Sequence, residues 1–222
     1  MSSTWGKAVA ELEGSPVGGA DRFEFAVVVT GQRGQGQDRA EVWSVGDGLV
    51  VALADGAGGT VHGARAAEAV IAVAQAEPDP AAWGAALEAL DQDATRLDGG
   101  QSTAVLLRVD AAGVRGLSVG DSGAWVVDPR GPSVQELTEA QRRKSLLGDG
   151  ATAVAFAAGP LGEATLLVAS DGLLAYAPQA ELARLAVKPD LQAAAHRLVD
   201  RVRLRSGALP DDVTVVLVRE RR

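Results

Sequence analysis

Three aspartates stand at the ends of apolar, strand-like runs in this sequence. Asp55 ends the run LVVALAD, Asp171 ends TLLVASD, and Asp211 directly precedes the last apolar run of the chain. A carboxylate at the end of a buried strand is unfavourable unless another group neutralises it. If the three meet, they need a cation, and oxygen ligands alone favour Mg²⁺ or Mn²⁺ over zinc. Taken singly, each aspartate also fits an ordinary turn.

The composition narrows the chemistry further. The chain has 222 residues, a formal net charge of −8, no cysteine and two histidines, His62 and His196. Disulfides, thiolate metal sites, a cysteine nucleophile and a three-histidine zinc site are therefore excluded. The acidic balance argues against a nucleic-acid partner. With 47% hydrophobic residues, the chain can bury a substantial core without cross-links.

Targeting and membrane signals are absent from the sequence. Its first residues include Glu11 and Glu13 and lack a continuous apolar stretch, so they do not resemble a secretory signal. No apolar run approaches the roughly 18 residues of a membrane span. We therefore expect a cytoplasmic protein that does not bind membranes.

The aspartates must be positioned by strands and helices, and the sequence pattern predicts these in separate blocks along the chain. Strand patterns at 23–30, 41–45 and 49–55 precede two alanine-rich helical segments at 62–77 and 80–97. The remaining expected elements are strands at 102–110, 114–121, 123–129, 133–137, 151–156 and 164–171, helices opening at Pro178 and Pro189, and a strand at 212–220. Helices grouped apart from antiparallel strands predict an α+β fold. We expect a loose lead-in at 1–20 and one domain over 21–222.

Four short motifs rich in Asp and Gly follow one another along the chain. They are Arg33-Gly-Gln-Gly-Gln-Asp38, Asp55-Gly-Ala-Gly-Gly59, Gln101-Ser-Thr-Ala104 with Val119-Gly-Asp-Ser122, and Ser170-Asp-Gly-Leu173 with Asp211-Asp-Val-Thr-Val-Val216. In this order and spacing they resemble the metal-dependent protein phosphatases, the type 2C serine/threonine phosphatases, and their bacterial branch in particular. The resemblance spans about residues 23–220. It implies an αββα four-layer sandwich, with two antiparallel sheets flanked by helix pairs.

The resemblance also implies a catalytic centre in which a water bridging two Mn²⁺ or Mg²⁺ ions attacks phosphorus. Asp55 would bridge both ions, and the carbonyl of Gly56 would bind the second. Asp171 and Asp211 would complete the ligands of the first ion, and Asp121 could join Asp171 around a weaker third.

Two further residues carry implied roles around the phosphate. Arg33 matches the position that binds it, because a planar guanidinium can hold two phosphate oxygens at once. Asp38 would orient the metal-bound water. We therefore assign Arg33, Asp38 and Asp55 as the candidate catalytic residues.

Several positions depart from the family pattern. Gly36 stands where the family has Asn, Thr60 where it has His, and Ala175 where an Asp is frequent. His62, two residues after Thr60, fits either a substitute proton donor or an ordinary residue at a helix N-terminus. The sequence leaves both interpretations open.

The flap that the family inserts between two late strands is shortened here to about residues 138–150. Thr138 and Gln141 have the spacing of a capping box and predict a short helix. The basic residues 142–144 within it fit a solvated helix face better than a guide for acidic peptides.

Two functions follow from the resemblance. The first is a serine/threonine protein phosphatase, a monomer acting on phosphorylated proteins and opposing a cognate kinase. The alternative is a pseudophosphatase that binds phosphoproteins as a regulatory module, which the substitutions at Gly36, Thr60 and Ala175 favour. Retention of Asp55, Asp171, Asp211 and Arg33 favours the enzyme, since buried carboxylates without a cation would only destabilise the fold.

Overall fold

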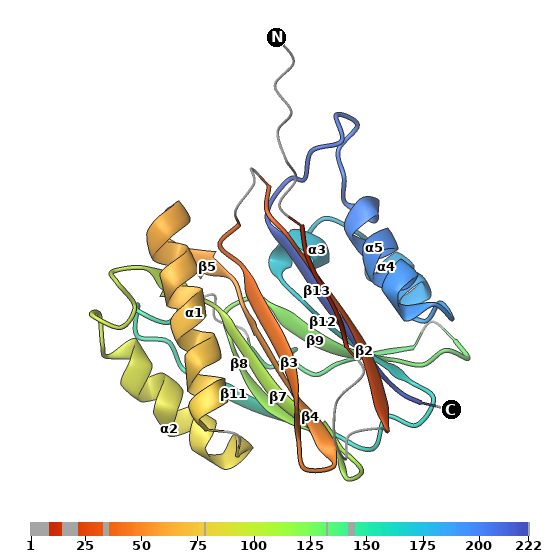
Figure 1. Cartoon of the computed structure of the whole chain (residues 1–222), viewed down its shortest axis with the longest axis horizontal. Helices are drawn as coiled ribbons and strands as arrows, with labels where there is room; N and C mark the ends of the chain where they lie inside the picture. Colours follow the sequence, from red (N-terminus) through yellow and green to blue (C-terminus); the bar gives the residue numbers. More distant parts are fainter. Residues whose placement is uncertain are drawn as a thin grey trace.

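The protein is a stack of two antiparallel sheets between two helix pairs (Figure 1). A computed structural model describes residues 9–14, 22–32, 36–77, 79–131, 133–141 and 145–221. One sheet has the strand order β1-β2-β13-β12-β9-β10, the other the order β11-β8-β7-β4-β3. A small ladder joins β5 to β6.

The strands of the first sheet are β1 (Val9–Gly14), β2 (Phe23–Thr30), β9 (Gly123–Val127), β10 (Val134–Glu136), β12 (Thr165–Ala169) and β13 (Val213–Glu220). The strands of the second are β3 (Arg39–Val45), β4 (Gly48–Ala54), β7 (Ala104–Asp110), β8 (Gly113–Val119) and β11 (Val154–Ala158). The short ladder consists of β5 (Gly56–Ala57) and β6 (Gln101–Ser102). The last strand, β13, pairs with the early strand β2, so the first sheet combines strands from both ends of the chain.

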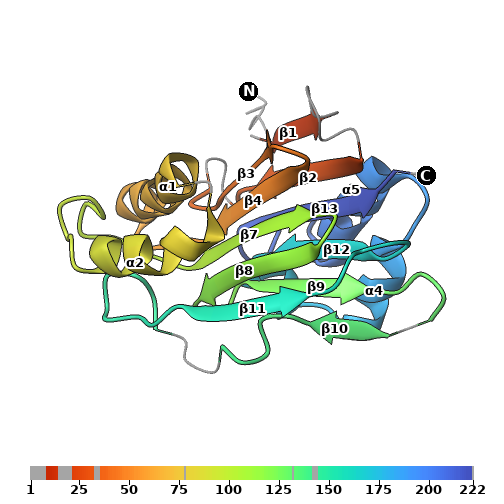
Figure 2. The same ribbon diagram turned by 90° about the horizontal axis from the view of Figure 1, so that it is seen from below.

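Helices cover the outer face of each sheet, as the two perpendicular views show (Figures 1 and 2). Helices α1 (Thr60–Ala76) and α2 (Pro80–Asp91) pack on the second sheet, and α4 (Gln179–Ala186) and α5 (Leu191–Arg201) pack on the first. The short α3 (Asp171–Leu174) follows β12. The predicted αββα sandwich is therefore confirmed.

Three apolar layers hold this stack together. Side chains such as Leu53, Leu107 and Val216 fill the space between the sheets. Trp83 and Leu106 belong to the layer under α1 and α2, and Leu198 to the layer under α5. Successive side chains of a strand point to opposite faces, so near-continuous apolar runs such as those of β4 and β12 supply both faces of a sheet and allow burial on both sides.

The structure differs from the sequence-based expectations at β1 and at the end of α2. Strand β1 lies within the segment that the sequence suggested as a loose lead-in, and it pairs with β2 from Val9↔Thr30 to Gly14↔Phe25. The second helix, expected over 80–97, ends at Asp91. The Asp93 carboxylate accepts hydrogen bonds from the Thr95 and Arg96 amides, and this local turn replaces the helical pattern.

None of the helices in the described part of the chain is long and apolar enough to cross a membrane.

Candidate functional site

Asp55 lies where β4 ends, and neighbouring hydroxyl groups fix its backbone. Its amide donates to Thr103 Oγ1 at 2.9 Å, and its carbonyl oxygen accepts from the Thr103 amide at 2.8 Å and Ser102 Oγ at 3.1 Å. Thr103 Oγ1 in turn shares a hydrogen bond of 2.8 Å with Ser122 Oγ. The hydroxyl residues in both halves of the third motif thus hold Asp55, a role that was not predicted from the sequence.

Asp171 and Asp211 come together because β12 and β13 are adjacent antiparallel strands. Ser170 directly precedes Asp171. Its hydroxyl oxygen accepts from the Thr214 amide at 3.0 Å, and its own amide donates to the Thr214 carbonyl oxygen at 3.2 Å. A Cβ placed on Gly172 would lie 3.4 Å from Asp211 Cβ and would overlap the carbonyl oxygen of Asp212. The absence of a side chain at Gly172 therefore allows the two segments to meet.

Asp38 precedes β3 and is buried, with 1% of its surface exposed. Within the described part of the chain, no group forms a normal hydrogen bond to either of its carboxylate oxygens. Burial raises the pKa of Asp38 to about 6, although Asp55, Thr214 and Ser170 partly counter this effect. A buried carboxylate without donors is unfavourable as an anion, so it fits a site completed by a cation or a bound water.

The carboxylates of Asp38, Asp55 and Asp171 form one acidic cluster. Burial raises the pKa of Asp55 to about 10, and the adjacent charges of Asp38 and Asp171 act in the same direction. The strand ends therefore bring together residues that are far apart in the sequence. Their mutual repulsion is what a divalent cation would relieve.

Gly56 lies in close contact with the first turn of α1. A Cβ on Gly56 would overlap the backbone carbonyl of Gly63. The side-chain amide of Gln37, oriented with its nitrogen toward this loop, donates to the carbonyl oxygens of Gly59 at 2.7 Å and Gly56 at 3.2 Å. Gln37 thereby links the Asp38 segment to the carbonyl that the sequence analysis assigned to a metal.

The remaining candidates lie at the edge of this cluster or outside the described residues. Asp211 is exposed, and its Oδ1 accepts from the Asp212 amide at 2.9 Å. Asp121 lies in the turn before β9, whose Gly123 pairs with Ala169, so it shares a sheet end with Asp171. Arg33 falls in the segment 33–35, outside the described residues. Over the described ranges, no group of three or more His, Asp or Glu side chains is arranged as a metal site.

His62 lies in the first turn of α1 and is largely exposed. Its Nδ1 lies 2.8 Å from the carbonyl oxygen of Asp98 and 3.2 Å from Asp98 Oδ2. Arg65 donates to the same Oδ2 at 2.8 Å. Asp98 was not predictable as a partner from the sequence, because it lies in a turn 36 residues after His62.

The short flap packs on a helix. The Asp91 carboxylate at the end of α2 accepts from the amides of Gly148 at 2.7 Å and Ala151 at 3.3 Å. Leu147 is buried and forms a β-bridge with Ser102. Residues 138–140, which open the predicted short helix, form a turn in which the Gln141 amide donates to the Thr138 carbonyl oxygen at 2.9 Å. The basic residues 142–144 lie outside the described residues.

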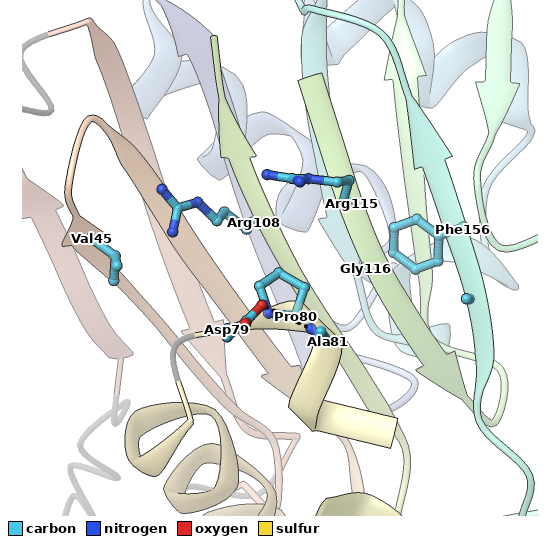
Figure 3. A pocket seen from close by; sticks show the side chains of 9 residues that line it. Val45, Asp79, Pro80, Ala81, Arg108, Arg115, Gly116 and Phe156 are labelled. Atoms are coloured by element: carbon cyan, nitrogen blue, oxygen red, sulfur yellow. Dashed lines mark hydrogen bonds between the residues drawn. The ribbon is translucent and has the colours of Figure 1, made fainter. Parts of the chain in front are cut away.

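A cavity of about 720 Å³ lies at the end of the second sheet that is remote from Asp55 (Figure 3). Val45, which lines it, closes the β3–β4 hairpin at the end remote from Asp55. Arg108 and Arg115 also line it and are cross-strand partners. Asp110 Oδ2 accepts from both guanidinium groups, at 3.1 and 2.9 Å. The arginine charges are thus compensated within the protein, and this cavity is separate from the acidic cluster.

No protein-family model and no curated protein sequence matches the chain. Its architecture does match solved structures of bacterial phosphatases. The Mycobacterium tuberculosis serine/threonine phosphatase PstP has a TM-score of 0.72 at 20% identity, with 90% of this chain and 100% of that chain covered. The S. agalactiae serine/threonine phosphatase has a TM-score of 0.73 at 19% identity, with 89% of this chain and 99% of that chain covered. RsbX, solved in complex with magnesium, has a TM-score of 0.72 at 16% identity, with 96% of this chain and 100% of that chain covered.

These likenesses show the fold. The chain has the fold of the metal-dependent serine/threonine phosphatases over nearly all of its length, as the resemblance in the sequence implied.

Proposed function

We propose that this protein is a metal-dependent phosphatase that hydrolyses phosphoserine and phosphothreonine in proteins. The observation that supports this most directly is the acidic cluster of Asp38, Asp55 and Asp171 at one end of the sandwich. A structure of the PstP catalytic domain holds two manganese ions, and RsbX was solved with magnesium. Divalent cations are therefore bound by other proteins with this fold.

The donor set fits Mn²⁺ or Mg²⁺. Asp55, the Gly56 carbonyl, Asp171 and Asp211 would hold two ions, and Asp121 a weaker third. These donors are all oxygen atoms, which suits hard divalent cations. The unpartnered oxygens of Asp38 and the charge repulsion around Asp55 leave the cluster short of positive charge, which the ions would supply.

The protein's own groups would then bind and orient the substrate. When bound, the ions supply an activated water and neutralise negative charge on the phosphoryl group. Asp38 would accept a hydrogen bond from the attacking water and fix its direction toward phosphorus. Arg33 would hold two of the phosphate oxygens with its guanidinium group. The bond that the Asp55 amide donates to Thr103 Oγ1 and the bond that the Asp55 carbonyl oxygen accepts from Ser102 Oγ keep this backbone in place, so little rearrangement is needed during the reaction.

The substrate and setting follow from the same proposal. The short flap packs on α2 through Asp91, so this segment does not form a large substrate-shaping subdomain. An open site suits phosphorylated side chains presented by other proteins. We propose that the protein acts as a monomer in the cytoplasm, opposing a serine/threonine kinase.

One observation favours a second function. Across the described ranges, the acidic side chains do not form a ready metal site. Together with Gly36, Thr60 and Ala175, this finding fits a pseudophosphatase that binds phosphoproteins without hydrolysing them. A measurement of Mn²⁺ binding together with turnover distinguishes the enzyme from the binding module.

The test is hydrolysis of p-nitrophenyl phosphate by the full chain with Mn²⁺, with EDTA, and for Asp55→Asn. The matched control is Asp47→Asn, which removes the same charge in the exposed β3–β4 turn. Turnover that needs metal, survives in Asp47→Asn and is lost in Asp55→Asn supports the enzyme. Absence of both turnover and calorimetric Mn²⁺ binding in the wild type would overturn it and favour the binding module.

A further inference from the structure

The side chain of Asp212 accepts hydrogen bonds from two backbone amides of one loop. Gln32 N lies 2.7 Å from Asp212 Oδ1, and Gln37 N lies 2.6 Å from Oδ2. The Gln32 side chain adds a bond of 2.6 Å to the carbonyl oxygen of Pro210. Hydrogen bonds to an ionised acceptor are shorter and stronger than those between neutral groups. One carboxylate thus fastens the loop at Gln32 and at Gln37, the residues that flank the segment 33–36.

Gly36 is the steric counterpart of Asp212. A Cβ at position 36 would lie 2.8 Å from Asp212 Oδ2 and 2.9 Å from Gly31 Cα, and both distances are too short for a carbon atom. A side chain at position 36 is therefore incompatible with this position of the Asp212 carboxylate. Gly36 therefore makes room for the Asp212 carboxylate, which binds the backbone on both sides of it.

The braced loop leads directly into the acidic cluster. Gln37 donates its side-chain amide to the carbonyl oxygens of Gly56 and Gly59, and the next residue is the buried Asp38. The carboxylate of Asp212 is also close enough to Asp38 to raise the pKa of that group further. An additional negative charge beside an acidic cluster is unfavourable. The two amide donors offset this penalty, and an Asn side chain could not accept at both positions.

We infer that Asp212 is a positioning residue that fastens the backbone at Gln32 and at Gln37, beside the catalytic centre. Its neighbour Asp211 is the proposed metal ligand, whereas both oxygens of Asp212 are engaged by the loop. This inference rests on the proposed function. The sequence places the proposed phosphate-binding Arg33 between Gln32 and Gln37, so the bonds to Asp212 fix both sides of the segment that contains it.

Loss of the bonds to Asp212 is expected to change KM more than kcat. Asp38 is itself buried, so we expect the maximal rate to depend less on the bonds to Asp212 than phosphate binding does. Asp212→Asn leaves one amide without an acceptor and is expected to raise KM for a phosphothreonine peptide by about tenfold, with kcat changing less than about threefold. The Mn²⁺ concentration for half-maximal activity stays within about twofold, since Asp212 is not a ligand.

The experiment compares the full-length wild type with Asp212→Asn, Gly36→Ala, and the control Asp47→Asn, which removes the same charge at the remote hairpin. Steady-state kinetics gives KM and kcat, and amide hydrogen exchange in the metal-free protein gives the protection of Gln32 and Gln37. Exchange at one or both amides is expected to rise about tenfold or more in Asp212→Asn. Gly36→Ala, which forces the carboxylate away, is expected to change KM and exchange in the same direction.

The failures of the two proposals can be told apart. Wild-type turnover together with unchanged KM and unchanged exchange in Asp212→Asn and Gly36→Ala overturns the positioning role and leaves the phosphatase standing. Absence of wild-type turnover removes the phosphatase, while exchange still decides whether Asp212 fastens the loop. A large shift in Mn²⁺ dependence in Asp212→Asn would make Asp212 a metal ligand and would also overturn the inference.

Discussion

His62 and Asp98 form a contact that orients the histidine ring. The ring Nδ1 of His62 lies 2.8 Å from the Asp98 carbonyl oxygen and 3.2 Å from Asp98 Oδ2. Arg65 donates a hydrogen bond to the same Oδ2. The hydrogen bond from Arg65 holds the pKa of Asp98 below its ordinary value, with His62 acting in the same direction. Asp98 has a φ of +52°, which is uncommon for a residue other than glycine. The turn therefore holds Asp98 where it can fix the imidazole.

If His62 donates a proton to the leaving group, substrates with poor leaving groups should depend on it most. His62→Gln is expected to lower kcat for a phosphoserine peptide by about 100-fold, because an alkoxide needs a proton to leave. For p-nitrophenyl phosphate, whose leaving group is stable as an anion, the fall should be small. Parallel assays of the two substrates check this. Equal effects on both would assign His62 to helix structure and not to proton transfer.

The acidic cluster should make the metal-free protein less stable at high pH. Burial and neighbouring charge raise the pKa of Asp55 to about 10, and burial raises that of Asp38 to about 6. In the unfolded chain, aspartates titrate near about 3.9. The folded state therefore binds more protons above that pH, and the free energy of unfolding falls as pH rises toward about 10.

Urea unfolding in EDTA at about pH 5 and about pH 9 measures this dependence. Asp55→Asn should show a smaller loss of stability between the two pH values and a higher stability than wild type at the alkaline one. A wild-type stability that increases with pH would contradict the clustering of these carboxylates.

Gly56 and Gly84 should respond to alanine in opposite directions. A Cβ at Gly56 overlaps the Gly63 backbone in α1, so Gly56→Ala is expected to destabilise the fold by about 1–3 kcal/mol. Gly84 lies within α2 and has open space at its Cβ position, so Gly84→Ala should stabilise by about 0.5–1 kcal/mol. Chemical denaturation checks both. A Gly56→Ala variant as stable as wild type would refute the close packing of α1.

Arg33→Ala should weaken substrate binding without unfolding the protein. Loss of a bidentate guanidinium–phosphate contact is expected to raise KM for a phosphopeptide by about tenfold to 100-fold. The control is Arg130→Ala, an exposed arginine whose hydrogen bonds go to Asp128. An unchanged KM in Arg33→Ala, with the control also unchanged, would remove Arg33 from the phosphate site.

Local patterns in the sequence predicted an α+β fold, and the resemblance to the phosphatase family implied its four layers. Apolar strand-like runs, alanine-rich helices and Gly- or Pro-containing breaks correctly gave most of the order of strands and helices along the chain. The positions of Asp55 and Asp171 at strand ends were also evident from the sequence. Each follows an apolar run whose burial is determined by its own residues.

Other features depend on which segments meet in space. Asp38 lies in a polar stretch, and it is buried in the folded chain near Asp55, Thr214 and Ser170, which come from other parts of the sequence. Strand β1 exists through its pairing with β2, and the flap packs where Asp91 accepts its amides. The two hydrogen bonds that the Gln32 and Gln37 amides donate to Asp212 likewise join segments from opposite ends of the chain. Local periodicity determines which residues are apolar, whereas long-range hydrogen bonds and burial of polar groups arise only once the sheets have assembled.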